Sequence, residues 1–236
     1  MAVAYKPLLV LLAVFLLPVQ AFADEPNPDP FESWNRKVFT FNDWADRYML
    51  RPVAVGYTKV TPDPVERGIS RMFSNIGEVP TVLNSLLQGK PSRAANSTGR
   101  FLVNSTVGLL GFFDVARHVG LEKAEGEDFG QTLGRWGVPS GPYVVLPLLG
   151  SSTLRDAPSL LVDMYANPIY YMEDEGARLG VAAVGVVSTR ANLLDAETLI
   201  SGDRYLFIRD VYLQRREFLV RDGEVEDDFG DFDDYY

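Results

Sequence analysis

The segment 127–156, EDFGQTLGRWGVPSGPYVVLPLLGSSTLRD, combines frequent chain-breaking residues with an apolar filling. Five glycines and three prolines fall within it, which excludes a long helix or a central strand. Most of its other residues are apolar or aromatic, whereas ordinary surface loops are polar. An irregular apolar segment must pack inside the protein or line a cavity, where its backbone polar groups find partners. The segment therefore predicts a shaped apolar passage.

The regions on either side of this segment are typical of a mainly α protein. Apolar residues recur in them at helical spacing, and a strand is indicated only at 143–146. Proline and glycine residues divide the helical pattern into separate stretches. We expect helices at 31–49, 61–88 with an interruption at Pro80, 91–107, 152–165, 173–200 and 203–220.

The first expected helix has the clearest start signal. Asp29 fits an N-cap, Pro30 the first helical position and Glu32 a capping-box partner. Arg51-Pro52 is expected to end the helix. One broad apolar face contains Phe31, Trp34, Val38, Phe41, Trp44 and Tyr48. Periodicity supports two interpretations of this face: a core helix packed on other helices, or a helix lying in a membrane interface, where Trp and Tyr are enriched.

The chain begins with the features of a secretory signal peptide. Lys6 precedes an apolar run at 8–17, and Ala21-Phe22-Ala23 forms an A-x-A cleavage site. We expect a signal peptide at 1–23, a helical domain at 24–221 and an acidic, disordered tail at 222–236. An uncleaved N-terminal anchor is the alternative. No later apolar run approaches the roughly 20 residues that a transmembrane helix needs.

The chain contains no cysteine. An exported fold must then be stable without disulfides, and thiol catalysis, zinc–thiolate sites and a cysteine-linked lipid anchor are excluded. The net charge is -10, but eight acidic residues fall in the tail at 222–236, so the rest of the mature chain is nearly neutral. The sequence therefore lacks the basic surface that nucleic-acid binding requires.

Catalytic and metal-binding motifs are scarce. The single histidine, His118, is interpreted as a helix-end residue, and the serines at 151–152 lack the G-x-S-x-G spacing of a nucleophile elbow. Neither a calcium-binding loop nor a set of kinase motifs is present. We expect no catalytic residues, no metal and no cofactor. The competing enzyme interpretation is a lipid hydrolase, with Ser151 or Ser152 as nucleophile and His118 as base.

An ordered set of short motifs along residues 29–220 resembles the MlaA (VacJ) family. The motifs are DPFE-x-x-NR at 29–36, F-x-FN at 39–42, RPVA at 51–54, N-x-x-LQG at 84–89, RFL-x-N-x-x-x-G at 100–108, GFFDVA at 111–116, DFGQTLG at 128–134 and GPY-x-x-LP-x-x-G-x-x-x-x-RD at 141–156. Single motifs of this length are weak signals. Their common order over most of the chain makes the resemblance specific.

The resemblance implies a ring-like bundle of amphipathic helices around a central lipid channel. It implies a position in the inner leaflet of the Gram-negative outer membrane, on the periplasmic side. There the protein would remove mislocalised phospholipids from the outer leaflet and pass them to a periplasmic, MlaC-like lipid carrier, with a trimeric outer-membrane porin as partner. The alternative within this resemblance is an adaptor that binds porin without transporting lipid.

This chain departs from the family at two positions. Many relatives carry a cysteine at the signal cleavage site, where this chain has Ala23-Asp24, so attachment would depend on interfacial helices or on the porin. Relatives often have proline where this chain has Ser151.

The resemblance also implies a channel-side hairpin loop within the opening segment, at 129–143. Its candidate channel and hinge residues are Phe129, Gly130, Leu133, Gly134, Gly137, Gly141 and Tyr143. Gly137 and Gly141 are the expected hinges, because glycine permits two backbone arrangements.

Overall fold

The computed structural model describes residues 28–224. The expected signal peptide at 1–23 and most of the acidic tail lie outside the described residues. The α-helices are α2 Glu32–Ala45, α3 Arg51–Val60, α4 Asp63–Leu87, α5 Pro91–Thr106, α6 Phe129–Arg135, α7 Asp156–Ala166, α8 Glu175–Ala191 and α9 Arg204–Val220. Shorter helical segments are the π-helix η2 Asp46–Leu50 and the 3-10 helices η3 Ala116–Val119, η4 Pro168–Tyr171 and η5 Asp195–Leu199. Strands β1 Tyr143–Leu146 and β2 Gly150–Thr153 form an antiparallel hairpin.

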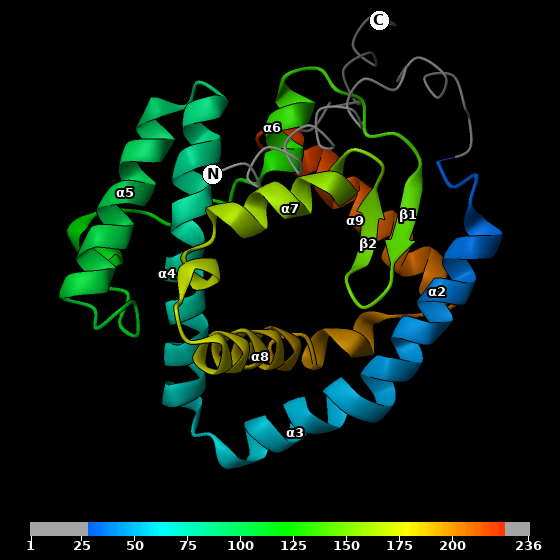
Figure 1. Ribbon diagram of the computed structural model, residues 1–236, viewed down its shortest axis with the longest axis horizontal. Helices are drawn as coiled ribbons and strands as arrows, with labels where there is room; N and C mark the ends of the chain where they lie inside the picture. Colours follow the sequence, from blue (N-terminus) through cyan, green and yellow to red (C-terminus); the bar gives the residue numbers. More distant parts are fainter. Residues whose placement is uncertain (1–27, 225–236) are drawn as a thin grey trace, which may run out of the picture.

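The helices are arranged as a ring (Figure 1). α4 forms one side, α7 lies across one end, and α3 and α8 lie together across the other end. α2 and the β1–β2 hairpin form the remaining side. α5 packs along α4 outside the ring, and α9 contacts both α6 and β2. The segment 127–156 therefore supplies α6, which packs on α7 and α9, and the β1–β2 hairpin, which packs on α2, α7 and α9.

The helix that begins the ring is longer than its sequence suggests. Arg51-Pro52 does not end it, because the π-helical turn η2 joins α2 to α3 and the chain stays helical to Val60. Pro52 then lies in the first turn of α3, where a missing N–H is tolerated. Asp29 is also not the N-cap: Phe31 occupies that position without a side-chain hydrogen bond.

Three further helix boundaries differ from the sequence-based expectation. α4 continues through Pro80, along the side where it packs on α5. The helix expected at 152–165 begins only at Asp156, because 150–153 pairs with β1 as β2. The helix expected at 173–200 ends at Ala191 and is followed by η5. The strand at 143–146 and the ends of α4 and α9 are as predicted.

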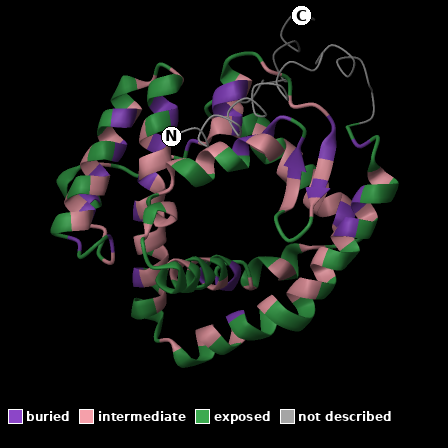
Figure 2. Ribbon diagram, viewed as in Figure 1, coloured by how far each residue is buried: buried purple, intermediate pink, exposed green. Residues whose placement is uncertain are grey.

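The described residues bury few large apolar side chains. The main core cluster contains Val38, Tyr143, Val145 and Tyr205, and it lies where α2, the hairpin and α9 meet. Figure 2 shows buried residues at this junction and also along α4, α5 and α6, with exposed residues along much of the rest of the ring. Asn35, fully buried, fastens this junction: its amide donates to the Asp29 carboxylate at 2.8 Å and to the Tyr143 carbonyl at 3.0 Å.

One helical stretch within the described residues, Glu175–Leu199, is long and apolar enough to cross a membrane by length and composition alone. This differs from the sequence-based expectation that no later segment approaches a span. α8 itself has 17 residues, which corresponds to about 26 Å and is shorter than the roughly 30 Å of a bilayer core.

Candidate functional site

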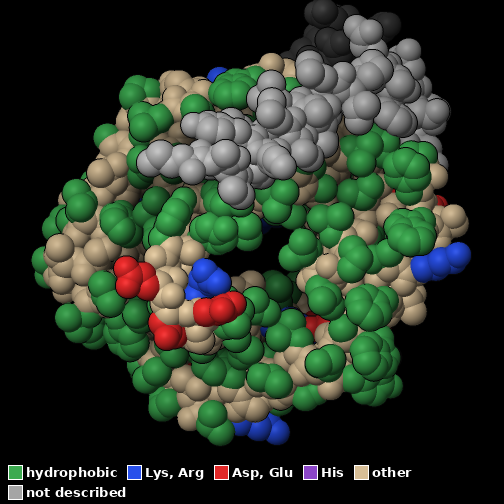
Figure 3. Space-filling model, in the orientation of Figure 1, with side chains coloured by type: hydrophobic (Ala, Val, Ile, Leu, Met, Phe, Trp, Pro, Cys, Tyr) green, Lys and Arg blue, Asp and Glu red, His purple; other side chains and the backbone are tan. Residues whose placement is uncertain are grey.

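A hollow lies at the centre of the ring. Figure 3 shows it with hydrophobic side chains around much of its rim. In the same orientation, the turn between β1 and β2 reaches towards the central space (Figure 1). Asn42 of α2 holds this turn: its amide donates to the Leu146 carbonyl at 2.9 Å and accepts from the Leu148 N–H at 2.8 Å. The turn is therefore anchored to the ring wall.

The tip of this turn presents two leucines, Leu148 and Leu149. Leu148 has a left-handed backbone, with φ of 62°, and is 72% exposed. Leu149 is exposed as well. A leucine held in this conformation without burial is not explained by core packing. These leucines are not among the candidate channel residues expected from the sequence, although Pro147 and Gly150 on either side mark a hairpin turn.

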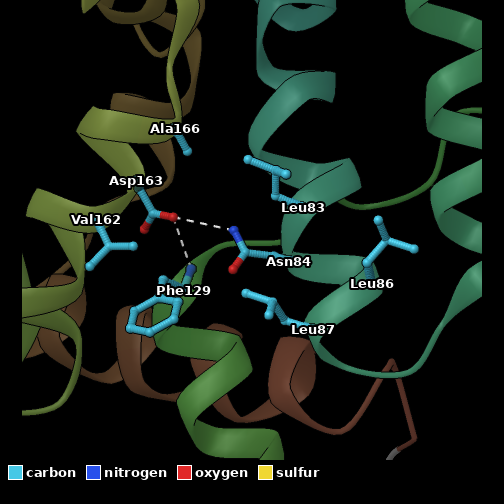
Figure 4. Close-up of a pocket in the computed structure, with 8 residues that line it drawn as sticks. All are labelled: Leu83, Asn84, Leu86, Leu87, Phe129, Val162, Asp163 and Ala166. Atoms are coloured by element: carbon cyan, nitrogen blue, oxygen red, sulfur yellow. Dashed lines mark hydrogen bonds between the residues drawn. The ribbon is translucent and has the colours of Figure 1, made fainter.

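An apolar pocket of about 390 Å³ lies between α4, α6 and α7 (Figure 4). Its lining residues are Leu83, Asn84, Leu86, Leu87, Phe129, Val162, Asp163 and Ala166. Asn84 and Asp163 are its polar members. One oxygen of Asp163, Oδ1, accepts hydrogen bonds from the Asn84 amide at 3.3 Å and from the Phe129 N–H at 2.9 Å. Asp163 thus joins the three helices that surround the pocket.

The Asp163 carboxyl is electrostatically unusual. Burial raises its pKa from 3.8 to about 6, and the nearby negative charge of Asp128 acts in the same direction. The hydrogen bonds from Phe129 and Asn84 and the positive charge of Arg216 oppose this rise only partly. Asp163 was not among the residues expected from sequence, because its neighbours are brought together only by the fold.

Asp163→Asn is expected to stabilise the protein at neutral pH by about 1 to 3 kcal/mol. The folded-state pKa of Asp163 lies above its unfolded value, so ionisation destabilises the fold. This penalty is absent below about pH 4 and complete above about pH 6. Asparagine retains the oxygen that accepts from Phe129 and Asn84. Urea denaturation at pH 7.5 and 4.5 measures the difference, and a variant no more stable than wild type at pH 7.5 contradicts the assignment.

A buried network of ion pairs lies beside the pocket, where α6, α7 and α9 meet. Arg216 of α9 donates to Asp156 at 2.9 Å and to Asp128 at 3.0 Å, and Arg155 donates to Asp156 at 2.7 Å. Two of the candidate channel glycines pack against this network. A Cβ at Gly130 would lie 2.5 Å from the Asp156 carboxylate, and a Cβ at Gly134 would lie 2.7 Å from the Arg155 guanidinium. Both glycines therefore permit α6 to pack closely against α7 and α9.

The remaining candidate channel residues lie in different environments. Phe129 lines the pocket, whereas Leu133 and Tyr143 are buried. Gly137 and Gly141 lie in the connection between α6 and β1, and both have left-handed backbones, with φ of 88° and 68°. A Cβ at Gly137 would meet open space, so this position has room to change conformation.

Most aromatic residues between Phe31 and Tyr48 are exposed, whereas Phe39 packs against the core cluster. Trp34 is 64% exposed and Trp44 is 53% exposed; Phe31, Phe41 and Tyr48 are exposed as well. The Phe41 and Trp44 rings stack, with centroids 6.4 Å apart. Val38, which the sequence placed on the same face, is instead buried: it is 8% exposed and belongs to the core cluster. We call Trp34, Phe41, Trp44 and Tyr48 the aromatic face.

The residues of the hydrolase interpretation have other partners. The Ser151 hydroxyl lies 2.8 Å from the Tyr143 hydroxyl, and His118 Nδ1 lies 3.1 Å from the Asp114 carbonyl. Ser152 is buried in β2. Within residues 28–224, no hydrogen bond joins His118 to either serine, and no group of three metal-binding side chains occurs.

Comparison with known proteins agrees with this architecture. The family model described as MlaA lipoprotein matches residues 27–219. The intermembrane phospholipid transport system lipoprotein MlaA of Escherichia coli K12 is 37% identical over 203 residues, which cover 84% of this chain and 80% of that protein. An uncharacterised protein of Rickettsia felis is 40% identical over 197 residues, which cover 82% of this chain and 78% of that protein.

A solved structure, reported as the structural basis for maintenance of bacterial outer membrane lipid asymmetry, matches with a TM-score of 0.72 and 38% identity. The match covers 81% of this chain and 98% of that chain. The mainly α, ring-like fold expected from the sequence is thereby confirmed. The family match and the identity over most of the chain lead to one conclusion: this protein belongs to the MlaA lipoprotein family.

Proposed function

We propose that this protein transports phospholipids between membranes. It removes mislocalised phospholipids from the outer leaflet of the Gram-negative outer membrane through the central hollow and passes them to a periplasmic carrier. The observation that carries this proposal is a ring with a hydrophobic rim around a hollow, in a chain whose E. coli relative is named as part of an intermembrane phospholipid transport system. The family is one of lipid transport and not a known class of enzymes.

The chemistry of a phospholipid matches the surfaces of the ring. Its two acyl chains need apolar walls, and its charged head group needs polar positions along the same path. The hydrophobic rim and the exposed leucines of the hairpin turn supply the first requirement. Asn84 and Asp163, in the pocket between α4, α6 and α7, supply polar groups.

Membrane attachment is proposed to depend on the aromatic face. The chain has no cysteine, so a cysteine-linked lipid cannot hold it. Exposed Trp and Tyr side chains on a helix are typical of the membrane interface, and binding increases with the apolar area buried. The proposed position is the inner leaflet on the periplasmic side, with a trimeric porin as the membrane partner and an MlaC-like carrier as the acceptor.

Deletion of the gene tests this function. Transport predicts that phospholipid exposed on the cell surface increases and that the wild-type gene restores it. If surface phospholipid is unchanged while a porin still co-purifies with the protein, the protein is a non-transporting adaptor and the proposal is wrong.

Gly137→Val is expected to raise surface phospholipid towards the level of the deletion strain. Valine is strained at the observed φ of 88°, so it changes the shape of the connection that carries the hairpin. Gly120→Val is the matched control, because Gly120 has a φ of 83° and similar open surroundings but follows η3, which packs on α5. If both variants, expressed at equal levels, maintain lipid asymmetry, Gly137 is not a hinge.

A further inference from the structure

The pocket between α4, α6 and α7 contains a carboxylate oxygen without a protein partner. Both hydrogen bonds of Asp163 go to Oδ1. Within residues 28–224, Oδ2 of Asp163 accepts no hydrogen bond, and the carboxylate forms no ion pair. The other lining residues are apolar apart from Asn84. An acidic group in such a pocket lacks the charge compensation that buried carboxylates normally have.

The charged side chains of α7, α9 and the start of α6 pair with one another and leave Asp163 without an ion-pair partner among the described residues. Asp128, Asp156 and Asp163 supply three carboxylates, and Arg155 and Arg216 supply two guanidinium groups. Arg216 is held by Asp128 and Asp156, and Arg155 is held by Asp156. α4 contributes only uncharged side chains to the pocket lining. A cation that enters the pocket would therefore restore the balance.

We propose that this pocket binds the ammonium group of an amine-bearing phospholipid, with Asp163 as the acceptor. The ammonium group would donate to the free Oδ2, and an acyl chain would lie along the leucines of α4. Leu83, Leu86 and Leu87 suit this role because they line the pocket and remain about half exposed. This inference rests on the proposed transport function and adds a head-group preference to it.

Charge complementarity favours this occupant over other lipids. An anionic head group, such as that of phosphatidylglycerol, has no cation to offer and would be repelled by Asp163. A fatty acid carboxylate would meet the same repulsion. A simple alkylamine shares the ammonium chemistry but lacks the glycerophosphate and second chain, so it distinguishes a general site for cationic amphiphiles from a phospholipid site.

The test is calorimetric binding to the full-length purified protein at pH 7.5. The probes are dihexanoyl phosphatidylethanolamine, dihexanoyl phosphatidylglycerol and hexylamine. Wild type is expected to bind the ethanolamine lipid about tenfold more tightly than the glycerol lipid, which corresponds to about 1.4 kcal/mol. Asp163→Asn is expected to reduce this preference to less than about twofold. The preference should also decline as the pH falls through the pKa of Asp163.

Asp63→Asn is the matched control. It removes the same charge from the exposed first turn of α4, about 30 Å along the helix from Asn84, and should keep the preference. Equal binding of both lipids by wild type, a preference that survives Asp163→Asn, or binding of hexylamine alone overturns the pocket proposal. If gene deletion still raises surface phospholipid in that case, the transport function stands. If neither lipid binds and deletion has no effect, both proposals are wrong.

Discussion

Replacing Arg216 with methionine is expected to lower the free energy of unfolding by about 3 to 5 kcal/mol. Within residues 28–224, the guanidinium group of Arg216 is the one cation shared by Asp128 and Asp156, and it joins α9 to α6 and α7. Methionine keeps much of the side-chain volume but leaves the buried Asp156 with fewer compensating partners, and it leaves Asp128 without an ion pair among the described residues. Removing one partner of a buried ion pair leaves an uncompensated charge, which destabilises the fold far more than replacing both partners with apolar residues.

The pH dependence of this loss identifies its cause. Burial alone would raise the pKa of Asp128, but the hydrogen bonds and charge of Arg216 outweigh it and hold the pKa below 3.8. A lowered folded-state pKa contributes stability that is present above the unfolded value and is lost as the pH falls through the folded value. The deficit of Arg216→Met should therefore be largest near pH 7 and shrink below about pH 4.

Arg215→Met is the control for this experiment. Arg215 precedes Arg216 in α9, but it is exposed and pairs with an exposed glutamate, Glu125. Exposed pairs contribute at most about 1 kcal/mol. Equal losses for the two variants in urea denaturation would contradict the proposed role of the network.

The double substitution Trp34→Gln, Trp44→Gln is expected to weaken binding to phospholipid vesicles about 1,000-fold to 10,000-fold. Each indole is more than half exposed on the aromatic face. Burying roughly 100 Å² of each ring in the interface would contribute about 2.5 kcal/mol per residue. Since neither side chain packs in the core, the fold should persist.

Vesicle sedimentation measures this binding, and circular dichroism checks the fold. Val119→Gln is the control, because Val119 is an exposed apolar residue on η3, away from the aromatic face. Unchanged sedimentation of the double variant would show that the aromatic face does not attach the protein to lipid.

Local sequence signals predicted the fold where local interactions determine it. The stop at Gln88-Gly89 and the strand at 143–146 follow from glycine conformation and residue type, and both occur in the structure. The helix end expected at Arg51-Pro52 and the interruption expected at Pro80 are absent from the structure, because the helices packed on these segments keep the backbone helical. Asp29 shows the same limit. It is a residue type that favours the N-cap, yet its carboxylate accepts hydrogen bonds from Asn35 and from the distant Tyr205 of α9.

The candidate site was less predictable than the fold. Phe129 was recognised from its motif, but Asp163 is 34 residues away from it and 79 residues from Asn84. No periodicity connects residues at such separations, so only the assembled ring reveals that they share a pocket. Val38 illustrates the opposite error. A helical projection placed it with the aromatic residues, although the hairpin and α9 cover it.

The most direct test of passage through the ring uses a single thiol at the hairpin tip. The chain has no cysteine, so Leu149→Cys creates a unique target in the turn that reaches towards the hollow. Cells that carry this variant are treated with a bulky fluorescein maleimide or with a small methylating thiol reagent, and surface-exposed phospholipid is then measured. The cysteine-free protein, treated in the same way, controls for the labelling of other proteins. The account predicts that only the bulky adduct raises surface phospholipid towards the deletion level. Normal surface phospholipid in cells whose protein is fully labelled with the bulky reagent would contradict it.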